Sequence, residues 1–121
     1  MSNDIFEFVR TSFPSVWALE LMMFLQEEPE RSWSAEDLEL ELRGSPVIVE
    51  LSLSSLVDAG IVVTSSDGRF RYQPASEDVD LLARATSELY RKKPDAVRRV
   101  ILSSSTTKFQ DLADAFKLKR D

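Results

Sequence analysis

The chain has 121 residues, of which 43% are hydrophobic and 30% are charged, and its formal net charge is −6. This length and composition are typical of one globular domain with a hydrophobic core, and they exclude bulk disorder. Because the sequence contains no cysteine and no histidine, it excludes disulfides, thiolate metal sites and a histidine general base, so we expect no enzyme activity, no cofactor and no metal ion.

The first elements predicted along the chain are two helices. Ser2 to Asp4 can cap a short helix with one apolar face, and Pro14 suits the first turn of a second helix. Residues 16–25 are apolar except for Glu20, so the second helix should be covered on several sides at the centre of the core. This run is about half as long as a membrane span, and the N-terminal residues lack a secretory-signal pattern, so we expect a cytoplasmic protein.

The next two helices are predicted to form a helix-turn-helix pair. Ser34 caps a helix of about eight residues, which is expected to end at Gly44. Ser45 and Pro46 then begin a helix of about fourteen residues, and Gly60 should terminate it. Two helices of these lengths, joined by a short turn, are typical of the helix-turn-helix motif.

The second helix of this pair has an outer face without basic residues. At 100° per residue, the positions expected to point toward the core are Val49, Leu53, Leu56 and Val57. The opposite face carries Val47, Ile48, Leu51, Ser54, Ser55 and Asp58. A helix that reads DNA needs donors for phosphates and base edges, yet residues 46–59 contain no Lys and no Arg. The pattern therefore favours a surface that contacts protein.

A β-hairpin is predicted directly after Gly60, where the apolar period changes from 3.6 to 2. Asp67 and Gly68 are typical of a two-residue type I′ turn between the strands. That turn predicts three cross-strand pairs, which are Val63 with Tyr72, Thr64 with Arg71, and Ser65 with Phe70.

The C-terminal part of the chain is predicted to be helical. Ser76 caps a long helix that begins with acidic residues and ends with Arg91, Lys92 and Lys93, an order that complements the helix dipole. Pro94 begins another helix with an apolar face, and a capping box at residues 107–110 predicts a last helix. Residues 76–117 should therefore form a helical extension.

Three segments carry a resemblance to a known superfamily. They are Ser34-Ala35-Glu36-Asp37-Leu38, the Leu53–Val62 segment with its L-x-x-L-x-x-x-G-I-V spacing, and Asp67-Gly68-Arg69-Phe70. These segments resemble winged helix-turn-helix regulators of the MarR and ArsR type. The resemblance covers about residues 13–74 and implies a winged-helix core there, mainly α with a small β-hairpin. The C-terminal third of the chain resembles no known family. From its length we expect the chain to form one domain over residues 1–121, with the helical extension at residues 76–117 following the core.

The resemblance also implies where a partner would bind. The recognition role would fall on Val47, Ile48, Leu51, Ser54 and Ser55, and the wing role on Arg69 and Arg71. We expect a non-enzymatic regulatory protein, associated with transcription or signalling, whose acidic and apolar helix-turn-helix face contacts another protein. The alternative is a DNA-binding repressor that uses the wing arginines together with a C-terminal basic cluster of Arg91, Lys92 and Lys93.

The distribution of charge bears on this choice. Residues 1–60 hold three basic and twelve acidic residues, a charge of −9, whereas residues 61–121 hold twelve basic and nine acidic residues, a charge of +3. Because the helix-turn-helix pair lies in the acidic half, it should repel DNA, and any DNA binding should be weak.

A homodimer formed by the N-terminal and C-terminal helices is also expected. Apolar residues on these helices exceed what a small winged-helix core can cover, and self-association is the commonest way to cover such a surface. The residues concerned are Ile5, Phe8, Leu82, Leu89, Tyr90, Ile101, Phe109 and Phe116.

Overall fold

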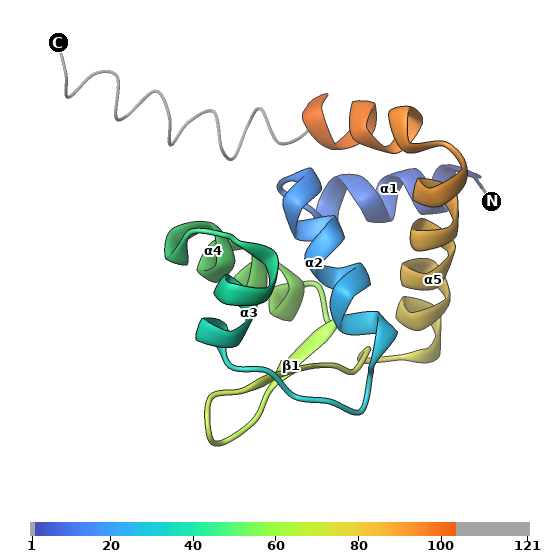
Figure 1. Ribbon diagram of the computed structural model, residues 1–121. Coiled ribbons are helices and arrows are strands. Elements are labelled where there is room, and N and C mark those ends of the chain that lie inside the picture. The colour runs from blue at the N-terminus through green and yellow to red at the C-terminus, as the bar shows by residue number, and fades with distance from the viewer. Residues whose placement is uncertain (1, 104–121) are drawn as a thin grey trace, which may run out of the picture.

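A computed structural model describes residues 2–103, with the side chains of residues 4–103 (Figure 1). The elements follow in the order α1 (Ser2–Ser12), α2 (Val16–Glu27), α3 (Ala35–Leu42), α4 (Pro46–Asp58), β1 (Val62–Thr64), β2 (Phe70–Tyr72) and α5 (Glu77–Lys92). A further helix covers residues 94–103. The prediction of a mainly α-helical protein with a small β-hairpin is confirmed. Within the described residues, no helix has the length and hydropathy needed to cross a membrane.

Serine caps fix the beginnings of four helices. The side chains of Ser34, Ser45 and Ser76 accept hydrogen bonds from backbone N–H groups three residues ahead, as the sequence predicts. Ser15 does the same for α2, with a distance of 3.1 Å from the Ala18 nitrogen to its Oγ. The prediction that Pro14 occupies the first turn of α2 is therefore wrong, because this helix begins after the serine.

The end of α3 also differs from the prediction. Arg43, and not Gly44, is the C-cap residue, and it adopts the left-handed conformation with φ 55°. Gly44 has another role, because a Cβ atom built on it would lie 2.4 Å from the indole ring of Trp17. The glycine is needed where the turn passes over this ring.

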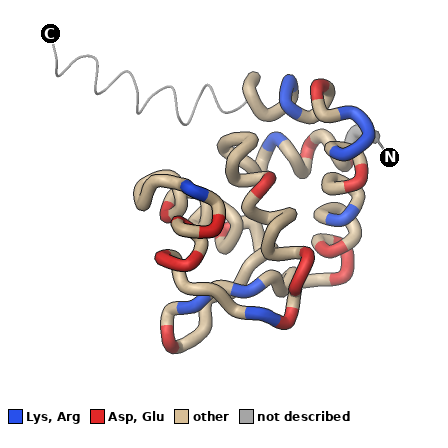
Figure 2. Tube along the Cα trace, in the orientation of Figure 1, with Lys and Arg blue, Asp and Glu red and all other residues tan. Residues whose placement is uncertain are grey.

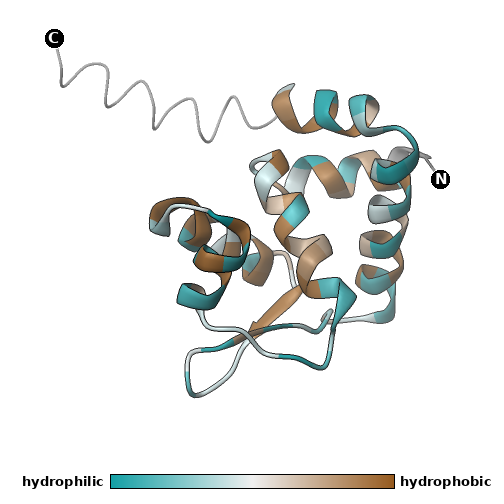
Figure 3. Ribbon diagram, in the orientation of Figure 1, coloured by the Kyte–Doolittle hydropathy of each residue, from teal (hydrophilic) through white to brown (hydrophobic). Residues whose placement is uncertain are grey.

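The hydrophobic core is organised around α2, as expected from its apolar sequence. Leu19, Leu21, Met22 and Leu25 are fully buried, and α2 packs against α4 and β2. Figure 3 shows apolar residues along α2 and α4. The helix at residues 94–103 completes the core with the buried Ile101.

The hairpin has a register one residue away from the predicted one. The observed pairs are Val62 with Tyr72, Val63 with Arg71, and Thr64 with Phe70. The Gly68 N–H donates to the Ser65 carbonyl at 2.9 Å, and the Ser65 N–H donates to the Arg69 carbonyl at 2.8 Å. Gly68 has φ 81°, so the connection is a three-residue loop with a left-handed glycine, not a two-residue type I′ turn.

This register places Val62 and Tyr72 against the core and Val63 and Arg71 on the outer face. Trp33, in the segment between α2 and α3, also pairs with Phe70 of the hairpin. Their two backbone hydrogen bonds measure 2.8 and 2.7 Å. This bridge, which was not predicted, ties the hairpin to the segment just before α3.

A buried polar network holds α5 against α2 and β2. The Tyr72 hydroxyl donates to Asp80 at 2.7 Å and accepts from the Gln26 amide at 3.2 Å. The Ser87 hydroxyl donates to the other end of Gln26 at 2.7 Å. Because the side chains of Gln26, Tyr72 and Ser87 are buried, these bonds specify one position of α5 on the domain.

Two of the residues expected at a dimer interface are instead internal. Ile101 is fully buried and Tyr90 is only 9% exposed. Tyr90 is held from two sides, since its hydroxyl donates to Glu20 at 2.8 Å and accepts from Arg98 at 3.3 Å. Sequence reasoning missed this because it could not show that the 94–103 helix folds back on the domain. Phe109, Phe116 and the predicted last helix lie outside the described residues.

Candidate partner-binding groove

The exposed side of α4 is rotated relative to the prediction. Its buried residues are Val49, Ser52, Leu53 and Leu56. Val57, which was predicted to be internal, is 36% exposed, so that prediction is wrong. The four buried residues are centred near Leu56, and Val57 lies at the edge of this face. α4 packs against both α2 and α3.

The five predicted partner-binding residues share one side of α4 but differ in exposure. Val47 is 61% exposed, and Ser54 is exposed as well. Ile48, Leu51 and Ser55 are half-buried. The predicted surface is therefore open at Val47 and Ser54 and partly covered at the other three residues.

A groove lies beside the exposed part of α4, between this helix, the beginning of α3 and the hairpin. Its volume is about 320 Å³. The lining residues are Ala35, Glu50, Leu53, Ser54, Val57, Asp58, Thr64 and Phe70. We call this the α4–hairpin groove, and Ser54 is the one predicted partner-binding residue that lines it.

The α4–hairpin groove combines apolar and acidic residues. Leu53, Val57 and Phe70 provide apolar surface from both α4 and β2. Glu50 and Asp58 are exposed, and no Lys or Arg belongs to the lining. A groove of this composition suits a ligand that carries both apolar groups and positive charge.

The first predicted wing residue, Arg69, is held against the domain. Its Nε donates to the Ser32 hydroxyl at 3.3 Å, and its Nη2 donates to the Ser32 carbonyl at 3.2 Å. The same Nη2 lies 3.5 Å from the Asp37 carboxylate at the beginning of α3. Arg69 therefore anchors the hairpin to α3, and part of its donor capacity is already used within the chain.

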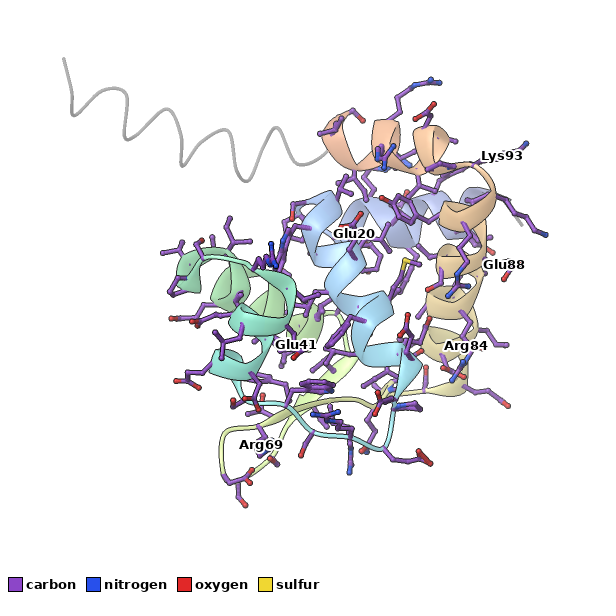
Figure 4. The ribbon with its side chains drawn as sticks, viewed as in Figure 1. Glu20, Glu41, Arg69, Arg84, Glu88 and Lys93 are labelled. Carbon is purple, nitrogen blue, oxygen red and sulfur yellow. The ribbon has the colours of Figure 1, made fainter. Side chains whose placement is uncertain are left out.

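The remaining predicted cations lie apart from Arg69. Arg71 is exposed on the outer face of the hairpin, where it donates a hydrogen bond to Gln73. Arg91 and Lys92 at the end of α5 form ion pairs with Glu88, at 3.7 and 3.8 Å. Figure 4 shows Arg69 and Lys93 at opposite ends of the molecule, and Figure 2 shows acidic residues on α3, next to the hairpin. The five cations do not gather into one basic surface.

Sequence reasoning missed the hairpin side of the groove. Thr64 and Phe70 line it because the observed register pairs them on the face next to α4. The predicted turn paired Ser65 with Phe70 instead of Thr64, so it did not place Thr64 and Phe70 together beside α4. The one available signal was the run Ser65-Ser66-Asp67-Gly68, which also fits a three-residue loop with a terminal glycine.

The described residues contain no group of three or more carboxylates that could hold a metal ion. Comparisons of the chain with protein-family models, with curated proteins and with solved structures found no match.

Proposed function

We propose that the chain is a non-enzymatic winged-helix regulatory protein of the cytoplasm, which binds a segment of another protein in the α4–hairpin groove. The winged-helix assignment is supported by the order of elements, in which α2, the Trp33 bridge, α3, α4 and the hairpin follow one another. The position of α4 then corresponds to the recognition helix, and the hairpin to the wing.

The composition of the groove is the observation that carries this proposal. Glu50 and Asp58 offer carboxylates next to the apolar side chains of Val57 and Phe70. A partner segment with one or two large apolar side chains would bury them against Val57 and Phe70. Neighbouring Lys or Arg residues of that segment would pair with the carboxylates of Glu50 and Asp58. Buried apolar anchors supply most of the affinity at such sites, and charge pairs at the rim add specificity and speed of association.

DNA binding receives less support from the same geometry. The groove-facing side of α4 would bring Glu50 and Asp58 toward phosphates, which is unfavourable. Arg69 is already paired with Asp37, which leaves Arg71 as the exposed cation of the hairpin among the described residues. A duplex contacted by so few cations would gain little affinity from counterion release.

The proposal can be tested with peptides selected from a randomised display library against the purified protein. We expect the enriched peptides to combine apolar residues with Lys or Arg. The double variant Glu50→Lys/Asp58→Lys should weaken their binding by about tenfold or more, because attraction becomes repulsion at both ends of the groove.

A matched control is available in Glu30→Lys/Glu41→Lys. Both residues are exposed and lie outside the groove lining, and the change in net charge is the same. Binding should stay nearly unchanged in this control. If both double variants lost peptide affinity equally, the loss would be an effect of net charge, and this would contradict binding in the groove. The repressor alternative would be favoured if the protein bound random-sequence duplex DNA tightly at about 150 mM salt and lost this affinity in the Arg71→Glu variant.

A further inference from the structure

The helix α5 lies at the edge of the domain (Figure 1), and its outer side carries an apolar strip. The buried residues of this helix are Ala83, Thr86, Ser87 and Tyr90. The strip lies on another side of the helix and consists of Leu81, Leu82, Ala85 and Leu89. Leu81 is 61% exposed, and the other three are half-buried, with Leu89 also packed in part against the core. An apolar strip of this kind on a helix is typical of a surface that packs against another helix.

The charges beside the strip change sign along the helix. Glu77 and Asp78 lie at its beginning, and Arg91 and Lys92 lie at its end, where the single carboxylate of Glu88 pairs with both and leaves a net positive charge. A second α5 running in the opposite direction would therefore place its basic end beside the acidic beginning of the first. The helix dipoles would also be antiparallel, which is favourable.

We propose that two copies of the chain associate through α5, packed antiparallel about a twofold axis at Ala85. Asp78 and Lys92 are each seven positions from Ala85, and Leu81 and Leu89 are each four positions from it. The twofold axis therefore places Asp78 opposite the partner's Lys92 and Leu81 opposite the partner's Leu89. The small side chain of Ala85 allows the two helices to approach closely at the axis.

The cleft between α1 and α5 supports this choice of occupant. It has a volume of about 700 Å³ and is lined by Asp4, Glu7, Phe8, Thr11, Asp78, Leu81 and Leu82. This mixture of carboxylates and apolar side chains lies beside the beginning of α5, where the partner's Lys92 and Leu89 would arrive. The partner's α5 would therefore contact residues of α1 in this cleft as well as the strip on α5.

The size of the contact predicts a weak dimer. A helix of 16 residues is about 24 Å long, and one helix pair with part of α1 buries less than a standard stable interface. The association should therefore depend on protein concentration in the micromolar range. It leaves the α4–hairpin groove of each copy open, because α4 and α5 lie on opposite sides of α2 (Figure 1).

Site-directed crosslinking tests the twofold axis. Because the chain has no cysteine, Ala85→Cys introduces one thiol, and two such thiols at the axis would be close enough for a disulfide. We expect rapid formation of a disulfide-linked dimer under mild oxidation. The control Ser66→Cys, on the exposed hairpin loop, should remain largely monomeric. Equal crosslinking of both variants, or none in Ala85→Cys, would overturn the proposal.

Charge reversal tests the register. Asp78→Lys and Lys92→Asp should each weaken self-association by about tenfold in sedimentation experiments, because like charges then face each other twice. The double variant Asp78→Lys/Lys92→Asp should restore it, since each reversed charge again meets its opposite on the partner. Failure of the double variant to recover would overturn the register. Peptide binding at the groove should be unaffected in all three, so the two proposals fail separately.

Discussion

Arg69 and Asp37 join the hairpin to the beginning of α3, with 3.5 Å between the Arg69 Nη2 and the Asp37 Oδ2. The two side chains are 40% and 45% exposed, so this ion pair alone stabilises the fold little. The position of this pair matters more, because it holds Arg69, one of the two cations of the hairpin, against α3 and away from the carboxylates of Glu50 and Asp58 in the groove.

Arg69→Ala should lower the free energy of unfolding by about 0.5–1.5 kcal/mol, because the variant loses the Ser32 hydrogen bonds together with the ion pair. Arg71→Ala is the matched control on the outer face of the hairpin, and it should change stability by less than about 0.5 kcal/mol. Urea unfolding followed by circular dichroism measures both. Equal losses in the two variants would contradict the anchoring role of Arg69.

Gly44→Ala should destabilise the protein by about 1–3 kcal/mol, because the added methyl group would collide with the Trp17 ring. Tryptophan fluorescence should shift at the same time, as the ring must move. Gly68→Ala provides a useful comparison, because no atom lies within 4 Å of the added Cβ and only the left-handed backbone is strained. A Trp17 signal that is unchanged in Gly44→Ala would contradict the close packing.

The sequence predicted most of the helices because local signals and core packing agree there. Serine caps, prolines and apolar spacing were enough to locate α3, α4 and α5. The hairpin register was missed because Asp67-Gly68 is compatible with both a two-residue and a three-residue loop, and the contact between Phe70 and Trp33 decides between them. That contact joins residues far apart in the sequence, so no local pattern could reveal it.

The candidate site was predicted only in part for the same reason. The absence of basic residues on α4 was visible in the sequence and led to the expectation of a protein-binding surface. Which part of α4 is open depends on how α2 packs against it, and this turned Val57 outward and Ile48 partly inward. The groove itself needs the hairpin, whose alignment with α4 follows from tertiary contacts.

Alkaline unfolding should depend on Tyr72. Burial, together with the hydrogen bond to Asp80, raises the pKa of its hydroxyl to about 12, from the ordinary value of 10.0. Above pH 10 the unfolded chain therefore loses this proton while the folded chain keeps it, so the free energy of unfolding falls as pH rises from 10 to 12. Burial raises the pKa of Tyr90 as well, so this residue also makes the free energy of unfolding fall as the pH rises above 10.

Tyr72→Phe should therefore be less stable at neutral pH by about 1 kcal/mol, since Gln26 and Asp80 lose a partner. Its further loss of stability above pH 10 should be smaller than that of the natural protein. Denaturant unfolding at a series of alkaline pH values measures both effects. A variant whose stability declines as steeply as that of the natural protein would show that Tyr72 does not retain its proton in the folded state.

The most direct test of the groove is to map the binding of a selected peptide by amide chemical shifts in ¹⁵N-labelled protein. The proposal predicts the largest changes at Glu50, Ser54, Val57, Thr64 and Phe70, with little change along the outer face at Val63 and Arg71 or at the end of α5. Saturable changes confined to the groove, and absent from the Glu50→Lys/Asp58→Lys variant, are the expected result. Changes centred on Val63 and Arg71, or produced by duplex DNA instead of peptide at about 150 mM salt, would contradict it.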